Sequence, residues 1–150
     1  MNTTLDPNIR RSLMLRVQSL SDQSAPEWGK MSLSQMLRHC IKNEELLLQD
    51  RAYPRTFIGR IFGGMVKRSM LKNEKPLAKN QPTHPDLIIQ GEGDPEAEVT
   101  QWQALIDRYG ELNSQQYATF VHPFFGKMTM EEVGIAAYKH IDHHLRQFGA

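Results

Sequence analysis

The stretch YKHIDHHLRQFG, Tyr138–Gly149, is the most informative in the chain, and it is strongly helical in character. His140 and His144 are four residues apart, so in an α-helix they lie one turn apart on the same face. Two imidazoles in that arrangement can bind one metal ion. The spacing therefore predicts half of a metal site.

Apolar neighbours indicate that the two histidines lie on the buried face of this helix. The residues that bracket them within roughly 100° of arc are Val133, Ala137, Ile141 and Phe148. Unpaired histidines on such a face would be costly, whereas a metal ion with acceptors behind the rings would satisfy both nitrogens of each ring. The alternative is that His140 and His144 are ordinary surface residues. Asp142 and His143 fall toward the polar side and are expected to face solvent or to support the ligands.

Four further helical segments precede this one. N-cap signals and apolar spacing place them from Asp6 to Leu20, from Ser32 to about Asp50, from Ile58 to Met70 and from Asp94 to Tyr109. In the last helix, Thr129 and Glu132 form a capping box and Gly149 is placed to end it. With no convincing alternating strand, this pattern predicts an all-α fold, a four-helix bundle that forms one domain over residues 1–150.

Glycines and prolines interrupt the middle of the chain. Gly59, Gly63 and Gly64 weaken the third helix and indicate a close approach of another helix, or a kink, because the strand that would precede a phosphate loop is absent. From Lys72 to Glu96 the helical pattern dissolves, which predicts a long loop of the kind that crosses between two bundle helices. The apolar run 87–89 could anchor that loop to the core.

Composition limits the classes of function. The chain has 150 residues, a formal net charge of +1, 39% hydrophobic and 23% charged residues, as in ordinary globular proteins, so no nucleic-acid partner is expected. No apolar run reaches about 18 residues and no export signal is visible, so we expect a cytoplasmic protein without a membrane partner. Because Cys40 is the single cysteine, any metal must be bound by histidine, carboxylate and water.

Charge is distributed unevenly. Residues 51–79 hold eight Lys or Arg and one acid, whereas residues 86–111 hold seven acids and one Arg. The simpler interpretation is that these segments face each other or water. The alternative is an anion-attracting rim on the third helix, suited to an acidic substrate or cofactor.

His39 lies at the flank of the apolar arc of the second helix, and its position alone leaves a surface and a functional role open. It is, however, the only histidine in a second helical segment, unlike His84 and His122. Trp28, SLSQMLRHC at 32–40, HPFFGKMT at 122–129 and the stretch at 138–149 together resemble the DinB-like (YfiT-like) superfamily, in particular a bacterial subgroup of unknown function.

The resemblance implies a four-helix bundle of up-down-down-up topology that binds one divalent metal through His39, His140 and His144. It also implies an enzyme of the thiol transferase or hydrolase class that acts on a small-molecule substrate, such as a low-molecular-weight thiol. An all-nitrogen site favours zinc or nickel, with manganese or iron as further candidates. Related bundles often pair, and eight methionines suit adaptable contacts, so a homodimer through exposed apolar faces is expected.

Other polar residues near these motifs are candidates for catalysis. Glu44, near the apolar arc one turn beyond His39, could orient a ligand or act as a base, and His122 could line the mouth of a pocket. Asn43 is expected at the surface, and Cys40 is expected to be a buried, inert thiol.

Two hypotheses remain, a metal-dependent enzyme and a non-catalytic bundle that binds a small molecule or a partner and keeps a structural or vestigial metal site. An open cleft over the three histidines would favour the enzyme.

Overall fold

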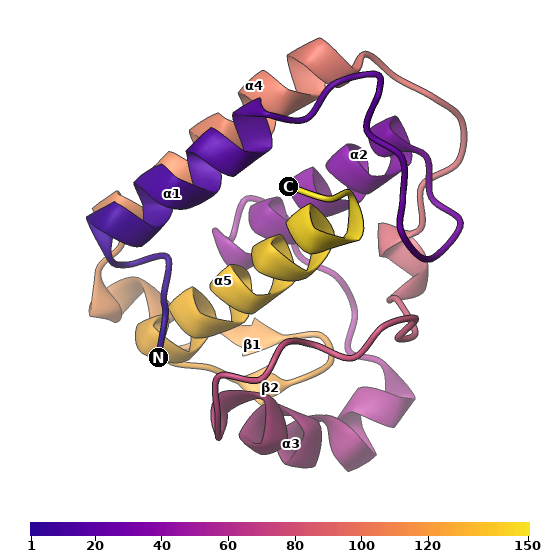
Figure 1. The fold of residues 1–150 in the computed structure, drawn as a ribbon. Coiled ribbons are helices and arrows are strands. Elements are labelled where there is room, and N and C mark those ends of the chain that lie inside the picture. The colour runs from indigo at the N-terminus through magenta and orange to yellow at the C-terminus, as the bar shows by residue number, and fades with distance from the viewer.

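The structure, a computed structural model, describes residues 1–150 and is mainly α-helical (Figure 1). Its helices are α1 (Pro7–Gln18), α2 (Leu33–Leu47), α3 (Phe57–Leu71), α4 (Pro95–Asp107) and α5 (Met130–Gln147). Three short 3₁₀ turns, η1 (Pro85–Leu87), η2 (Arg108–Glu111) and η3 (Ser114–Tyr117), and a small antiparallel hairpin, β1 (Val121–His122) with β2 (Gly126–Lys127), complete it. The prediction of a mainly helical fold is confirmed, and no helix combines the length and apolarity needed to cross a membrane.

The helices begin where the sequence signals place them. The Asp6 carboxylate accepts the backbone N–H groups of Asn8 and Ile9 at the start of α1, and Asp94 caps α4 in the same way. Ser32 and Thr129 form reciprocal capping boxes at α2 and α5. These caps satisfy N–H groups that have no partner inside the helix, so the helix starts are determined locally.

One hydrophobic core lies between α1, α2, α4 and α5. In this core α4 packs against α1 and α2, and α5 packs against the same two helices. Trp102 of α4 is fully buried at its centre. The predicted inner face of α5 is confirmed, because Val133, Ala137, Ile141 and Phe148 are all buried.

Helix α3 lies outside this group of four, at one end of the molecule, where it contacts α5 and β2 (Figure 1). Gly59 and Gly63 are its buried residues, and both face the turn at Phe124 and Phe125. The predicted close approach is therefore present, but it is made to the hairpin rather than to another helix. Five large apolar residues in the first part of α3 point the other way and are exposed: Phe57, Ile58, Ile61, Phe62 and Met65.

The long loop between α3 and α4 is anchored to the core by only part of the apolar run that was expected to hold it. Of the apolar run 87–89, Leu87 is buried in η1, while Ile88 is 58% exposed. Lys139 of α5 also holds the segment, because its ammonium group donates to the backbone carbonyls of Met70, Asn73 and Lys75. The loop is thereby fixed close to α2 and α5.

The glycine contact of α3 predicts the effect of an added methyl group. A Cβ at Gly63 would overlap the carbonyl of Phe124, whereas a Cβ at Gly64 would meet only the end of the Arg68 side chain, 3.8 Å away. We expect Gly63→Ala to destabilise the protein by about 1–3 kcal/mol, as overpacking does. Gly64→Ala should be neutral or stabilising, because alanine favours helix over glycine. Urea unfolding of both variants tests this, and equal stabilities would contradict it.

Candidate metal centre

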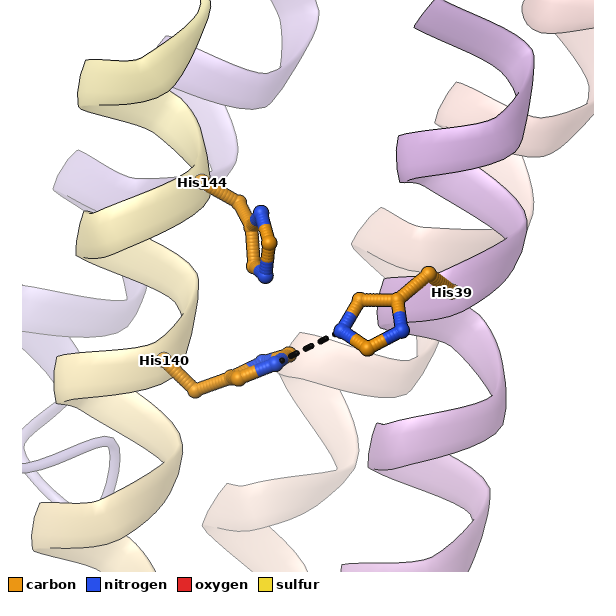
Figure 2. A group of neighbouring side chains, drawn as sticks. All are labelled: His39, His140 and His144. Carbon is orange, nitrogen blue, oxygen red and sulfur yellow. Dashed lines mark hydrogen bonds between the residues drawn. The ribbon is translucent and has the colours of Figure 1, made fainter. Parts of the chain in front are cut away.

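Three histidines from two helices converge in the interior (Figure 2). α2 supplies His39, and α5 supplies His140 and His144 from successive turns. Ring nitrogens of the three lie within 4.8 Å of one another, and the Nε2 atoms of His39 and His140 are 3.1 Å apart. The three predicted ligands are therefore brought together.

The outer nitrogens of two rings are held by acceptors. His39 Nδ1 lies 3.0 Å from the backbone carbonyl of Leu87, and His144 Nδ1 lies 2.8 Å from the side-chain oxygen of Gln147. Because both partners are acceptors, each Nδ1 must carry the proton and donate it. Each Nε2 then presents a lone pair to the centre, which is the form in which histidine binds a metal ion.

The third ring faces a carboxylate. His140 Nδ1 lies 4.0 Å from Glu44 Oε1, and neither atom has another hydrogen-bond partner although both are buried. A proton on Nδ1 would point at the carboxylate, whereas a bare Nδ1 lone pair would repel it. With Glu44 ionised, the pair therefore favours the same tautomer in His140, with Nε2 directed inward.

A cation fits this arrangement. With all three protons on Nδ1, the Nε2 atoms of His39 and His140 meet at 3.1 Å with a lone pair on each, which is repulsive unless a positive ion lies between them. A tetrahedral zinc ion with bonds of about 2.1 Å holds its nitrogen ligands about 3.4 Å apart. The three-histidine group therefore fits a divalent metal ion, while its donors alone leave the identity of the metal open.

Burial keeps these imidazoles neutral. Desolvation lowers the pKa of His39, lowers that of His144 to about 3 and lowers that of His140 well below its usual value, with the neighbouring histidines adding to the effect on His140 and His144. All three imidazoles are thus uncharged near neutral pH, with one nitrogen of each free to bind a metal ion. The His140 side chain remains 19% exposed, while His39 and His144 are buried.

Glu44 lies behind His140 and is fully buried. Burial raises the pKa of its carboxyl to about 7, an effect that the hydrogen bond from Tyr109 partly opposes. The Tyr109 hydroxyl donates to Oε2, so Oε1 is directed at His140. This geometry suits a residue that positions His140 better than a base that contacts substrate. Asn43, expected at the surface, is buried beside it, and that expectation was wrong.

His122 is not part of the three-histidine group. Its Nδ1 accepts the backbone N–H groups of Phe124 and Phe125, and its ring stacks on that of Phe125 at a centroid distance of 4.6 Å. Burial lowers the pKa of His122 to about 4, so the ring stays neutral and keeps Nδ1 free to accept. The structure thus gives His122 a role in shaping the turn that α3 packs against, and its predicted catalytic role remains a prediction.

Cys40 is buried, as expected, and its Sγ lies 3.6 Å from Met36 Sδ. Burial raises the pKa of this thiol well above its usual value, with the nearby Glu44 carboxylate adding to the effect. A protonated, enclosed thiol is a poor nucleophile.

The family model for "Protein of unknown function (DUF1569)" matches residues 4–150. The chain belongs to this family. Neither the curated proteins nor the solved structures contain a match. Because the match covers nearly the whole chain, all three histidines lie within the family's domain.

Three residues of this family member support the site without having been identified from its sequence: Leu87, Tyr109 and Gln147. Gln147 lies three residues after His144, within reach on the helix face, and that spacing was a usable signal. Its amide Nε2 also donates to the Trp28 carbonyl at 2.8 Å. Leu87 and Tyr109 are distant in sequence, so only the fold brings them to the histidines.

The facing pair Glu44 and His140 predicts a measurable contribution to metal binding. Replacing Glu44 by Gln removes the negative charge behind His140 and should weaken metal affinity about tenfold or more, as loss of a residue behind a ligand typically does. Glu45→Gln is the matched control, because Glu45 pairs with Arg51 and not with a ligand. Competition with a chromophoric chelator gives both affinities. An equal loss of metal affinity in the two variants would show that Glu44 does not support metal binding through His140.

The lowered histidine pKa values predict acid sensitivity of the metal-free protein. Below about pH 6.5 the unfolded histidines take up protons that His122 and His144, with pKa values of about 4 and 3, do not accept when folded. Stability should therefore fall as pH decreases, by about 1.4 kcal/mol per pH unit for each such group. Glu44, with its raised pKa, acts in the opposite direction below pH 7 but is outnumbered. Urea unfolding at pH 7 and pH 5 measures the net change in the free energy of unfolding. An unchanged value would contradict the expected loss of stability.

Proposed function

We propose that this protein is a divalent-metal-dependent enzyme of the DinB-like type, of the thiol transferase or hydrolase class, with His39, His140 and His144 as the metal ligands. The observation that carries this proposal is the convergence of ring nitrogens from α2 and α5, with Nδ1 of His39 and His144 bound to acceptors and Nδ1 of His140 facing a carboxylate. Histidines that only formed hydrogen bonds within the protein would have no need to direct three nitrogen lone pairs at one point.

A bound zinc or nickel ion would supply Lewis acidity, lowering the pKa of a coordinated water or thiol. The chain itself fixes the ligands. The Leu87 carbonyl and Gln147 each hold one ring, and Glu44 faces the third. Three protein ligands leave room for a small-molecule ligand, as in catalytic rather than structural zinc sites. Of the three ligands only His140 is partly exposed, so a substrate would approach from its side.

The proposal includes the topology of the DinB-like bundle. In this assignment α1, α2, α4 and α5 are the four bundle helices in up-down-down-up order, and α3 belongs to the long connection between α2 and α4. The packing of α4 and α5 against both α1 and α2 supports this assignment, as does the position of α3 outside the core.

Removing one ligand tests the site directly. His144→Ala should lower the bound metal, measured by elemental analysis, to less than a tenth of the wild-type content, because His144 supplies one of three nitrogens. α5 should survive, since the apolar residues of its inner face remain. His143→Ala is the matched control, as His143 directly precedes His144 on α5 and lies outside the three-histidine group.

Metal content and activity are then compared. A screen of thiol transfer and hydrolysis with zinc or nickel restored should find activity in the wild type and the His143 variant but not in the His144 variant. Equal metal content in all three proteins would remove His144 from the site. Metal binding without any activity in the screen would favour the non-catalytic bundle.

A further inference from the structure

Helix α3 carries a continuous apolar face that no part of the chain covers. Its exposed residues are Phe57 (76%), Ile58 (62%), Ile61 (57%), Phe62 (49%) and Met65 (57%). At 100° per residue these five side chains fall within about 140° of arc, so they form one stripe over the first two and a half turns. Two aromatic and three aliphatic side chains gathered on one helix exceed the scattered exposure that is normal for a soluble protein.

The outward direction of this stripe follows from the opposite side of α3. Gly59 and Gly63 lie against the backbone at Phe124, where a side chain larger than hydrogen would collide. Only the small-residue side of the helix can therefore face the protein. Lys139 fixes the other end of α3 by donating to the Met70 carbonyl, so the stripe is held in place rather than loosely attached.

Unpaired cations accompany the stripe. Arg60, Arg68 and Lys72 are exposed and form no ion pair, in contrast to Lys67, which is bound to Glu132. Arg68 and Lys72 follow Met65 on the same side of the helix, within about 60° of Phe57 around the axis. The one acid among residues 51–79 is Glu74, and the N-terminal amino group lies 3.2 Å from it. The α3 surface is thus apolar at its start and basic at its end.

We propose that this face of α3 docks on the surface of an anionic lipid bilayer. Helices that lie in the membrane interface combine an apolar face rich in aromatic and aliphatic residues with flanking Lys and Arg, which attract anionic headgroups. No membrane partner was expected, because a spanning helix needs a long apolar run, whereas an interfacial helix needs only one exposed face.

Charge decides between a bilayer and a second copy of the chain. A symmetric contact through α3 would bring the same set of unpaired cations from both copies to one interface, where like charges oppose pairing. The acid-rich α4 lies at the opposite end of the molecule from α3 (Figure 1). An anionic surface would therefore attract the α3 end more strongly than the α4 end, which orients the protein. This inference does not depend on a metal ion or on catalysis.

Vesicle co-sedimentation of the full chain tests the proposal. The wild-type protein should sediment with vesicles of 70% phosphatidylcholine and 30% phosphatidylglycerol but not with pure phosphatidylcholine, and raising salt from about 0.1 to 0.5 M should weaken binding. Phe57→Ser/Ile61→Ser and Arg68→Gln/Lys72→Gln should each reduce the bound fraction at least fivefold. The positions are exposed, so folding should persist, and circular dichroism checks this.

Matched controls come from surfaces away from α3. Leu15→Ser removes an apolar side chain that is 62% exposed on α1, and Arg11→Gln/Lys30→Gln removes two exposed cations outside any ion pair. Both should bind vesicles as the wild type does. Absence of wild-type binding, or equal loss in controls and α3 variants, would overturn the proposal. Dimers in sedimentation velocity that disappear in Phe57→Ser/Ile61→Ser, without vesicle binding, would overturn it in favour of a second copy.

Discussion

The outward hydrogen bonds of the buried imidazoles are the constraint on which the centre depends. Neutral histidine has one donor and one acceptor nitrogen, so an acceptor behind the ring decides what the inner nitrogen presents. The Leu87 carbonyl and the Gln147 amide make that choice for His39 and His144. These bonds also join the centre to two loops, because Leu87 lies in the connection to α4 and Gln147 reaches the Trp28 carbonyl. The irregular segments are thereby ordered by the same bonds that set the tautomers.

The same need for a partner applies to Glu44, whose carboxylate is costly to bury. A fully enclosed carboxylate needs hydrogen bonds or a positive partner. Tyr109 satisfies one oxygen, and the other faces His140. A cation among the imidazoles would stabilise the carboxylate through the His140 ring, and the carboxylate would strengthen His140 as a ligand. Burial raises the pKa of Glu44 to about 7, and a positive charge beside the carboxyl would lower that pKa again.

Much of this arrangement could be predicted from local sequence. The caps at Asp6, Ser32 and Thr129 and the spacing of His140 and His144 involve residues within one turn of each other. His39 required the family resemblance, because the flank of an apolar arc leaves its surroundings open. The burial of Asn43 and the contact of Glu44 with Tyr109 depend on where α4 and η2 pack, which no local pattern contains.

Helix α3 shows that periodicity alone does not determine which way an apolar face points. An apolar stripe predicts that its residues share one side of a helix, but not that this side meets the core. Steric fit decided the direction, because only the glycine side can approach the Phe124 backbone. None of the five exposed apolar residues of α3 belongs to the hydrophobic core between α1, α2, α4 and α5. The stripe therefore contributes little to folding, and its concentration of large side chains is better explained by contact with something outside the chain.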